Sequence, residues 1–119
     1  MAKNIDDLIN FATSTASIER YPTPANRLVK GTPEQINQTH FNVGDNFIVG
    51  EWGSEVGCWK TKYTENEFVY IISGKVILRD IDGREMMLQA GDKVCIPAGF
   101  EGEWEIVEAA KKIYAIYEA

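Results

Sequence analysis

The sequence contains one carboxylate in a setting where it could do chemistry. Glu67 lies at the start of the strand-like segment EFVYIIS, four residues after Tyr63. A carboxyl group enclosed by apolar residues can act as a general acid or base, and a neighbouring phenol can donate a hydrogen bond to a ligand. Alternatively, a buried carboxylate pairs with a tyrosine or an arginine as part of the fold. Both interpretations stay open for Glu67 and Tyr63.

The residues before Glu67 alternate as the residues of a strand do. Successive side chains of a strand point to opposite faces, so Trp59, Thr61 and Tyr63 share one face. Lys60 and Lys62 share the other face, and we expect both lysines to lie in solvent. The Trp-Thr-Tyr face is then expected to line the interior of the domain. The reverse arrangement, with the lysines inside, remains the alternative.

A second strand-like segment, GEWEIVE, is expected to complete the same pocket. Gly102, Trp104 and Ile106 share one of its faces. Aromatic walls with a few polar groups are typical of small-molecule sites. The candidate catalytic groups are Glu67, as acid or base, and Tyr63. The predicted ligand contacts are Trp59, Thr61, Tyr63, Glu67 and Trp104.

Several other kinds of chemistry are not indicated. Cys58 and Cys95 are too few for a disulfide framework, and we expect both to be small apolar fillers. The single histidine, His40, lies far upstream of the other candidates, so a Ser-His-Asp hydrolase has little support. The glycine-containing segments also lack the spacing of a phosphate-binding loop.

The composition predicts a soluble single domain. The 119 residues include 12 basic and 18 acidic side chains, which give a net charge of −6 spread along the chain. Nucleic acids and anionic membranes require concentrated positive charge, so we expect neither as a partner. Asp6 and Asp7 stand where an export signal would be apolar, and no apolar run reaches the length that spans a bilayer. We therefore expect a cytoplasmic location.

The N-terminal third predicts a helix and an arm. Asn4 can cap a short helix over residues 5–12, and Asp6 and Asp7 suit its first turn. Residues 13–34 lack periodicity and include prolines that impose an extended backbone. We expect residues 1–35 to form a unit of helix and arm that packs on the rest of the domain or on a partner subunit.

The remaining chain, residues 36–119, predicts short strands. Segments rich in β-branched and aromatic residues alternate with glycine, asparagine and aspartate turns. Asp82-Gly83 is the clearest hairpin turn, because both residue types tolerate positive φ. Eight such strands without a long helix predict an all-β antiparallel sandwich or barrel.

Residues 57 to 107 resemble the cupin superfamily. Glu67 and Gly74 match the E-x6-G of its first motif, and Gly91, Pro97 and Gly99 match the G-x5-P-x-G of its second. The resemblance implies an antiparallel jelly-roll barrel of the RmlC-like type. The closing segments are most similar to the branch of small single-domain cupins related to ureidoglycine aminohydrolase. One fold hosts many functions, so the resemblance specifies the fold more than the activity.

The resemblance also implies where a cupin metal would sit. Family members bind a divalent ion with two histidines and the glutamate of the first motif and a histidine of the second. Here the first pair falls on Lys60 and Lys62, or on Thr61 and Tyr63, and the second-motif histidine falls on Gly102. A glycine in place of this ligand, on the same face as Trp104, predicts room for an organic ligand instead of an ion. A single carboxylate cannot hold a transition metal against water. We expect no cofactor, and a divalent metal on substitute ligands is the alternative.

The expected function follows from these points. We expect a small cupin that binds a small polar metabolite in its barrel without the usual metal. The alternative is an enzyme, similar to an aminohydrolase or a lyase, in which Glu67 is the acid or base. Family members often pair through N-terminal strands, so the resemblance also implies a homodimer.

Overall fold

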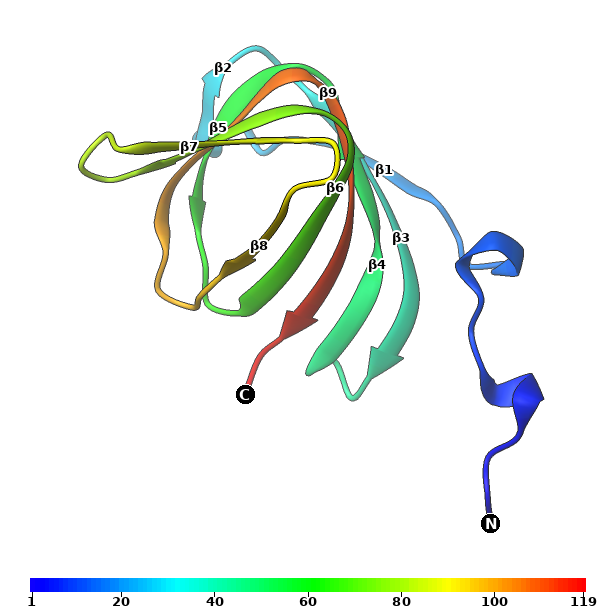
Figure 1. Cartoon of the computed structure of the whole chain (residues 1–119). Coiled ribbons are helices and arrows are strands. Elements are labelled where there is room, and N and C mark those ends of the chain that lie inside the picture. The colour runs from blue at the N-terminus through cyan, green and yellow to red at the C-terminus, as the bar shows by residue number, and fades with distance from the viewer.

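The computed structural model describes residues 1–119 as a single antiparallel sheet that curls into a barrel (Figure 1). The sheet has nine strands, and the only helical segments are three short 3₁₀ turns. All strand pairs are antiparallel, which confirms the predicted all-β class, and the strand order is compatible with the predicted jelly roll. The strands are β1 (Glu19–Pro22), β2 (Leu28–Lys30), β3 (Glu34–Val43), β4 (Phe47–Ser54), β5 (Gly57–Lys62), β6 (Asn66–Asp80), β7 (Glu85–Gln89), β8 (Lys93–Ile96) and β9 (Glu101–Tyr117).

Two long strands, β6 and β9, pair with each other and join the two halves of the barrel. One half contains β1, β3, β4 and β8, and the other contains β2, β5 and β7. The first half of β6 pairs with β8, and its second half pairs with β7. Likewise β9 pairs first with β5 and then with β4. The register of β6 against β9 shifts near Gly74, where φ is +86° and a Cβ atom would overlap the backbone of Ala109. This glycine therefore permits the close crossing at which both strands bend.

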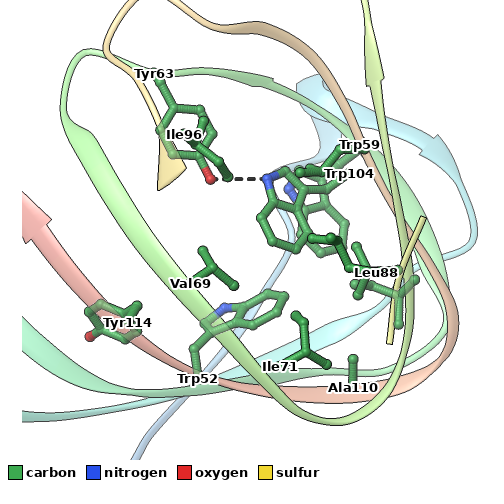
Figure 2. Packing of buried hydrophobic residues seen from close by; sticks show 13 residues of the cluster. Trp52, Trp59, Tyr63, Val69, Ile71, Leu88, Ile96, Trp104, Ala110 and Tyr114 are labelled. Atoms are coloured by element: carbon green, nitrogen blue, oxygen red, sulfur yellow. Dashed lines mark hydrogen bonds between the residues drawn. The ribbon is translucent and has the colours of Figure 1, made fainter. Parts of the chain in front are cut away.

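The core lies between the two halves. Inward residues of β6 alternate with outward ones, and Val69, Ile71 and Val76 are almost fully buried. Trp52 comes from one half and contacts Trp59 and Trp104 of the other, with ring centroids 6.0 and 5.8 Å apart (Figure 2). Edge-to-face aromatic contacts of this kind add to the hydrophobic burial of the rings.

The Asp82-Gly83 hairpin is confirmed. Of the two predicted turn residues only Gly83 has a positive φ, +84°, and the turn that joins β6 to β7 spans residues 81–84. The side chain of Asp80 stabilises the turn, because its Oδ1 accepts hydrogen bonds from the backbone N–H groups of Asp82 and Arg84. In Figure 1 this hairpin projects from the barrel on the side opposite the N-terminal segment.

The predicted helix over residues 5–12 is wrong. The structure has two separate 3₁₀ turns there, η1 (Ile5–Asp7) and η2 (Phe11–Thr13), each begun by an asparagine cap. The predicted Asn4 cap is present, but the apolar side chains Ile5 and Leu8 are exposed and make no contact that would stabilise a longer helix. A short helix without such contacts is marginal in water.

The N-terminal arm is attached to the barrel by His40 of β3. Its imidazole stacks on the ring of Phe11 with centroids 4.1 Å apart, and its nitrogens lie 2.6 Å from Ser14 Oγ and 3.1 Å from Glu51 Oε2. Further along the chain, β1 pairs with β3 and β2 pairs with β5. The later part of residues 1–35 therefore contributes strands to the sheet. None of the helical turns is long or apolar enough to cross a bilayer.

Candidate functional site

A buried polar network occupies the barrel interior around Glu67. The hydroxyl of Tyr63 donates to Glu67 Oε1 at 2.6 Å, and the ammonium of Lys112 donates to Oε2 at 2.7 Å. The indole N–H of Trp104 in turn donates to the Tyr63 hydroxyl at 3.0 Å, the dashed contact of Figure 2. Glu67 is 5% exposed and Lys112 is 7% exposed. Each oxygen of the carboxylate therefore has a donor, as buried charges require.

Lys112 is a residue of this network that the sequence analysis missed. Its ammonium lies 4.6 Å from the ring centre of Trp52 and 4.5 Å from that of Trp104, within the range of cation–π attraction. The alternation in β9 does contain a signal, because Ala110, Lys112 and Tyr114 share the buried face of the strand. A lysine on the apolar face of a strand predicts a buried partner, although not which one.

The network has a defined charge state at Tyr63. Burial raises the pKa of the Tyr63 hydroxyl far above its ordinary value, and the negative charge of Glu67 raises it further. The phenol therefore keeps its proton and acts as a donor throughout the physiological range. Removing either member of the Glu67–Lys112 pair would leave a charge buried without its partner.

The predicted contact residues lie in three different settings. Trp59 faces Trp104 across the β5–β9 pair, and both rings are buried in the core. Tyr63 joins the network with Glu67. Thr61 is half-buried and lines a shallow groove on the barrel surface between Lys60 and Lys62.

Lys60 and Lys62 are exposed, as the strand alternation predicted. The principal cavities of the structure are not lined by Trp59, Tyr63 or Trp104, whereas Glu67 borders an apolar groove with Phe68. A ligand contact at these side chains stays a prediction.

The residues present do not fit the usual cupin metal centre. Both oxygens of Glu67 already accept hydrogen bonds, and one of the donors is a cation. At Gly102, the second-motif histidine position, any Cβ atom would overlap the carbonyl oxygen of Arg79, because β6 and β9 approach closely there. This glycine is thus required by the backbone and does not leave the interior space that the sequence analysis expected beside Trp104. No group of three or more His, Cys, Asp or Glu side chains could hold a metal ion.

An open cavity of about 270 Å³ lies at the mouth of the barrel. It lies between β7 and β8. Each of these strands pairs with β6, but they do not pair with each other. Inward-facing side chains of the core, Leu78 and Ile96, form its floor together with Phe100. Asp80 and Arg84 of the hairpin stand at its rim. We call this space the mouth cavity.

The mouth cavity lies next to the buried network. The rings of Phe100 and Tyr63 pack edge to face with centroids 6.1 Å apart, and the backbone N–H of Tyr63 donates to the carbonyl of Phe100 at 2.8 Å. Phe100 and Ile96 therefore separate the cavity from the Tyr63 hydroxyl. Arg84 was not among the predicted site residues, and no local signal in the sequence links it to this cavity.

Solved structures similar to this chain share its fold. The EutQ protein of Clostridium difficile is 21% identical, with a TM-score of 0.66 over 73% of this chain and 64% of its own. A DUF861-family protein of unknown function from Pseudomonas syringae is 20% identical, with a TM-score of 0.76 over 86% of this chain and 45% of its own. The chain thus spans less than two thirds of either protein.

A third structure has nearly the same extent as this chain. The EutQ candidate of Salmonella typhimurium LT2 is 14% identical, with a TM-score of 0.65 over 89% of this chain and 99% of its own. No functionally curated protein matches. These likenesses do not single out the ureidoglycine aminohydrolase branch. The family model of the EutQ-like cupin domain matches residues 41–114, more than half of the sequence. The chain therefore belongs to the EutQ-like cupin family.

Proposed function

We propose that this cupin binds a small organic metabolite at the mouth cavity without the usual cupin metal. One observation carries the proposal: the barrel interior is filled by aromatic side chains and an ion pair, but residues of the core line the mouth cavity. Small-molecule sites typically combine an apolar concave floor with a few polar groups at the edge. Leu78, Ile96 and Phe100 supply the floor, and Asp80 and Arg84 supply the polar groups.

The interior residues predicted from the sequence lie behind the apolar floor of the mouth cavity. A ligand that displaces the ring of Phe100 would reach the Tyr63 hydroxyl, which is already polarised by Glu67. Trp104 would then form a wall of the enlarged site, with Trp59 behind it. The mouth cavity is thus the entrance through which a polar group could reach the predicted contacts.

Two adjacent methionines provide a test of the site. Met86 lines the mouth cavity, and Met87 points to the opposite face of β7, while their exposed fractions are similar at 53% and 56%. In a panel of small organic acids, amines and amides, a few compounds should raise the melting temperature of the native protein. Met86→Trp, which fills the mouth, should remove those shifts, and Met87→Trp should keep them. A silent panel, or equal loss in both variants, would reject the proposed site.

The alternative enzymatic function is favoured by one feature of the network. A tyrosine hydroxyl and a lysine ammonium converge on the same carboxylate, an arrangement that can move a proton once a substrate replaces one donor. Any compound identified by the panel can be tested for turnover. The acid–base role predicts that Glu67→Gln abolishes turnover while the protein stays folded, and unchanged turnover would exclude it.

We also propose that two copies associate. An apolar groove of about 520 Å³ is lined by the exposed side chains of Phe47, Phe68 and Tyr117 and reaches the buried residues Glu67 and Ile96. Ile5 and Leu8 of the arm are exposed as well. Neither surface is covered by apolar residues of its own chain. In a dimer, the arm of each copy could pack on the apolar groove of the other copy. Light scattering should report twice the mass of one chain, and a monomer would refute the proposal.

A further inference from the structure

The rim of the mouth cavity carries a carboxylate with one uncommitted oxygen. Asp80 Oδ1 accepts hydrogen bonds from the backbone N–H groups of Asp82 at 2.9 Å and Arg84 at 3.0 Å. These two bonds hold the carboxyl group in place. Its second oxygen, Oδ2, has no hydrogen bond or ion pair within the protein, although Asp80 is half-buried and lines the cavity. A fixed carboxylate with a free oxygen is a preorganised acceptor for a cationic group.

The same rim carries a guanidinium without a partner. The side chain of Arg84 lines the cavity and makes no ion pair or hydrogen bond within the protein. The neighbouring Arg79 is the opposite case, because it bonds Glu85, Glu103 and Glu105 at 2.7, 2.9 and 3.0 Å. The carboxylate of Glu85, which also borders the cavity, is therefore already neutralised. One anionic and one cationic group remain free at the rim.

The floor between these groups is apolar. Leu78 and Ile96 are buried core residues, and Phe100 covers Tyr63 from the cavity side. A ligand that fills the cavity must therefore place an apolar portion against the floor and its charged portion at the rim. A purely anionic or purely cationic ligand would match only one of the two free groups.

We infer that the mouth cavity binds a zwitterion with an apolar side chain, of the α-amino acid class. Its ammonium group pairs with Asp80, its carboxylate pairs with Arg84, and its side chain packs on Leu78, Ile96 and Phe100. This inference rests on the proposed ligand-binding function and specifies its ligand class. Satisfying both charges at once avoids the penalty of leaving one of them poorly solvated beside a bound apolar group.

Calorimetry with matched ligands tests the two charge contacts separately. The probes are L-phenylalanine, N-acetyl-L-phenylalanine, which lacks the ammonium group, and L-phenylalaninamide, which lacks the carboxylate. L-phenylalanine should bind the native protein, and each derivative should bind about tenfold or more weakly, because it loses one charge-assisted contact. L-leucine, which keeps both charges, should bind more tightly than either derivative.

Two variants should change this ranking in different ways. Asp80→Asn keeps an oxygen for the turn but removes the negative charge. It should therefore weaken the binding of L-phenylalanine and leave the affinity for N-acetyl-L-phenylalanine unchanged. Arg84→Gln should weaken the binding of L-phenylalanine and leave the affinity for L-phenylalaninamide unchanged. Asp92→Asn is the matched control, because Asp92 Oδ2 accepts from the backbone N–H of Gln89 in another turn, away from the cavity.

The outcomes separate this inference from the proposed function. Equal affinity for all three phenylalanine compounds, with sensitivity to Met86→Trp, would overturn the zwitterion class and keep the mouth cavity as the site. Binding of none of the four probes would also overturn the inference. In that case the metabolite panel with the Met86→Trp and Met87→Trp pair decides independently whether the mouth cavity binds another class of compound.

Discussion

The barrel contains two pairs of opposite charges whose surroundings differ. Glu67 and Lys112 are buried, lie 2.7 Å apart and share hydrogen bonds and aromatic contacts. Asp80 and Arg84 stand at the rim of the mouth cavity, and their side chains form no ion pair with each other or with other residues. The same two kinds of functional group thus serve the fold in one place and remain available to a ligand in the other. The proposed ligand site therefore rests on the free charges at the rim and not on the buried pair, whose groups already bond each other.

Breaking the buried pair should have the largest effect on stability. Lys112→Met leaves the Glu67 carboxylate buried without its cation, so we expect the free energy of unfolding to fall by about 3–5 kcal/mol. Urea denaturation measures this change. The double variant Glu67→Met with Lys112→Met removes both charges and should recover most of the loss. A single variant as stable as the native protein would show that the pair contributes little.

Removing one aromatic contact to the pair should have a smaller effect. Trp104→Phe loses the indole hydrogen bond to Tyr63 and weakens the contact with Lys112, at an expected cost of about 1–3 kcal/mol. Trp59→Phe is the control, because Trp59 is equally part of the core but makes neither contact. Thermal denaturation of the two variants should rank Trp104→Phe as the less stable, and equal losses would assign both effects to packing alone.

The two cysteines extend the comparison to pH. Burial and the nearby Glu103 raise the pKa of the Cys58 thiol to about 11, above its ordinary value of 9.0, whereas Cys95 is exposed. A raised pKa in the folded state favours folding below the unfolded pKa, and this contribution is lost as the pH rises from about 9 to 11. Cys58→Ala should therefore lose less stability over that alkaline range than Cys95→Ala, as urea titrations at each pH would measure.

Thiol labelling gives an independent check of the same contrast. Iodoacetamide at neutral pH should modify Cys95 and spare Cys58, because the thiolate is the reactive species and Cys58 is 2% exposed. Mass spectrometry of peptides would identify the labelled residue. Rapid modification of Cys58 in the folded protein would contradict its burial.

Removing the free charge of the rim should have the smallest effect on stability. The Arg84 side chain has no partner in the protein, so Arg84→Gln should change the free energy of unfolding by less than about 0.5 kcal/mol. Arg79→Gln is the contrasting variant, because it breaks contacts to Glu85, Glu103 and Glu105 and should be the more destabilised. A large loss in Arg84→Gln would indicate that this residue serves the fold after all.

Much of the fold could be predicted because strand alternation and turn chemistry are local. The Asp82-Gly83 hairpin and the outward direction of Lys60 and Lys62 both follow from residues within a few positions. The helix over residues 5–12 failed as a prediction for the complementary reason. A helix there would need tertiary partners for Ile5 and Leu8, but both side chains are exposed on the part of the arm that extends away from the barrel (Figure 1).

The candidate site was less predictable because its parts are distant in sequence. Glu67 and Tyr63 are four residues apart and could be grouped by spacing, but Lys112 lies 45 residues beyond Glu67. The mouth cavity depends on Leu78 of β6 and Ile96 of β8 facing one space, while β7 and β8 do not pair with each other. No local pattern encodes these relations.

The sequence by itself determined the strand alternation, the family motifs and the absence of the histidines that a cupin metal requires, because these are properties of residue type and local spacing. Only the tertiary structure decided that Lys112 and Tyr63 contact Glu67, and that a cavity with an apolar floor lies beside Asp80 and Arg84. The physical reason is that close packing and charge pairing depend on where distant strands meet, and the register of β6 against β9 sets that position.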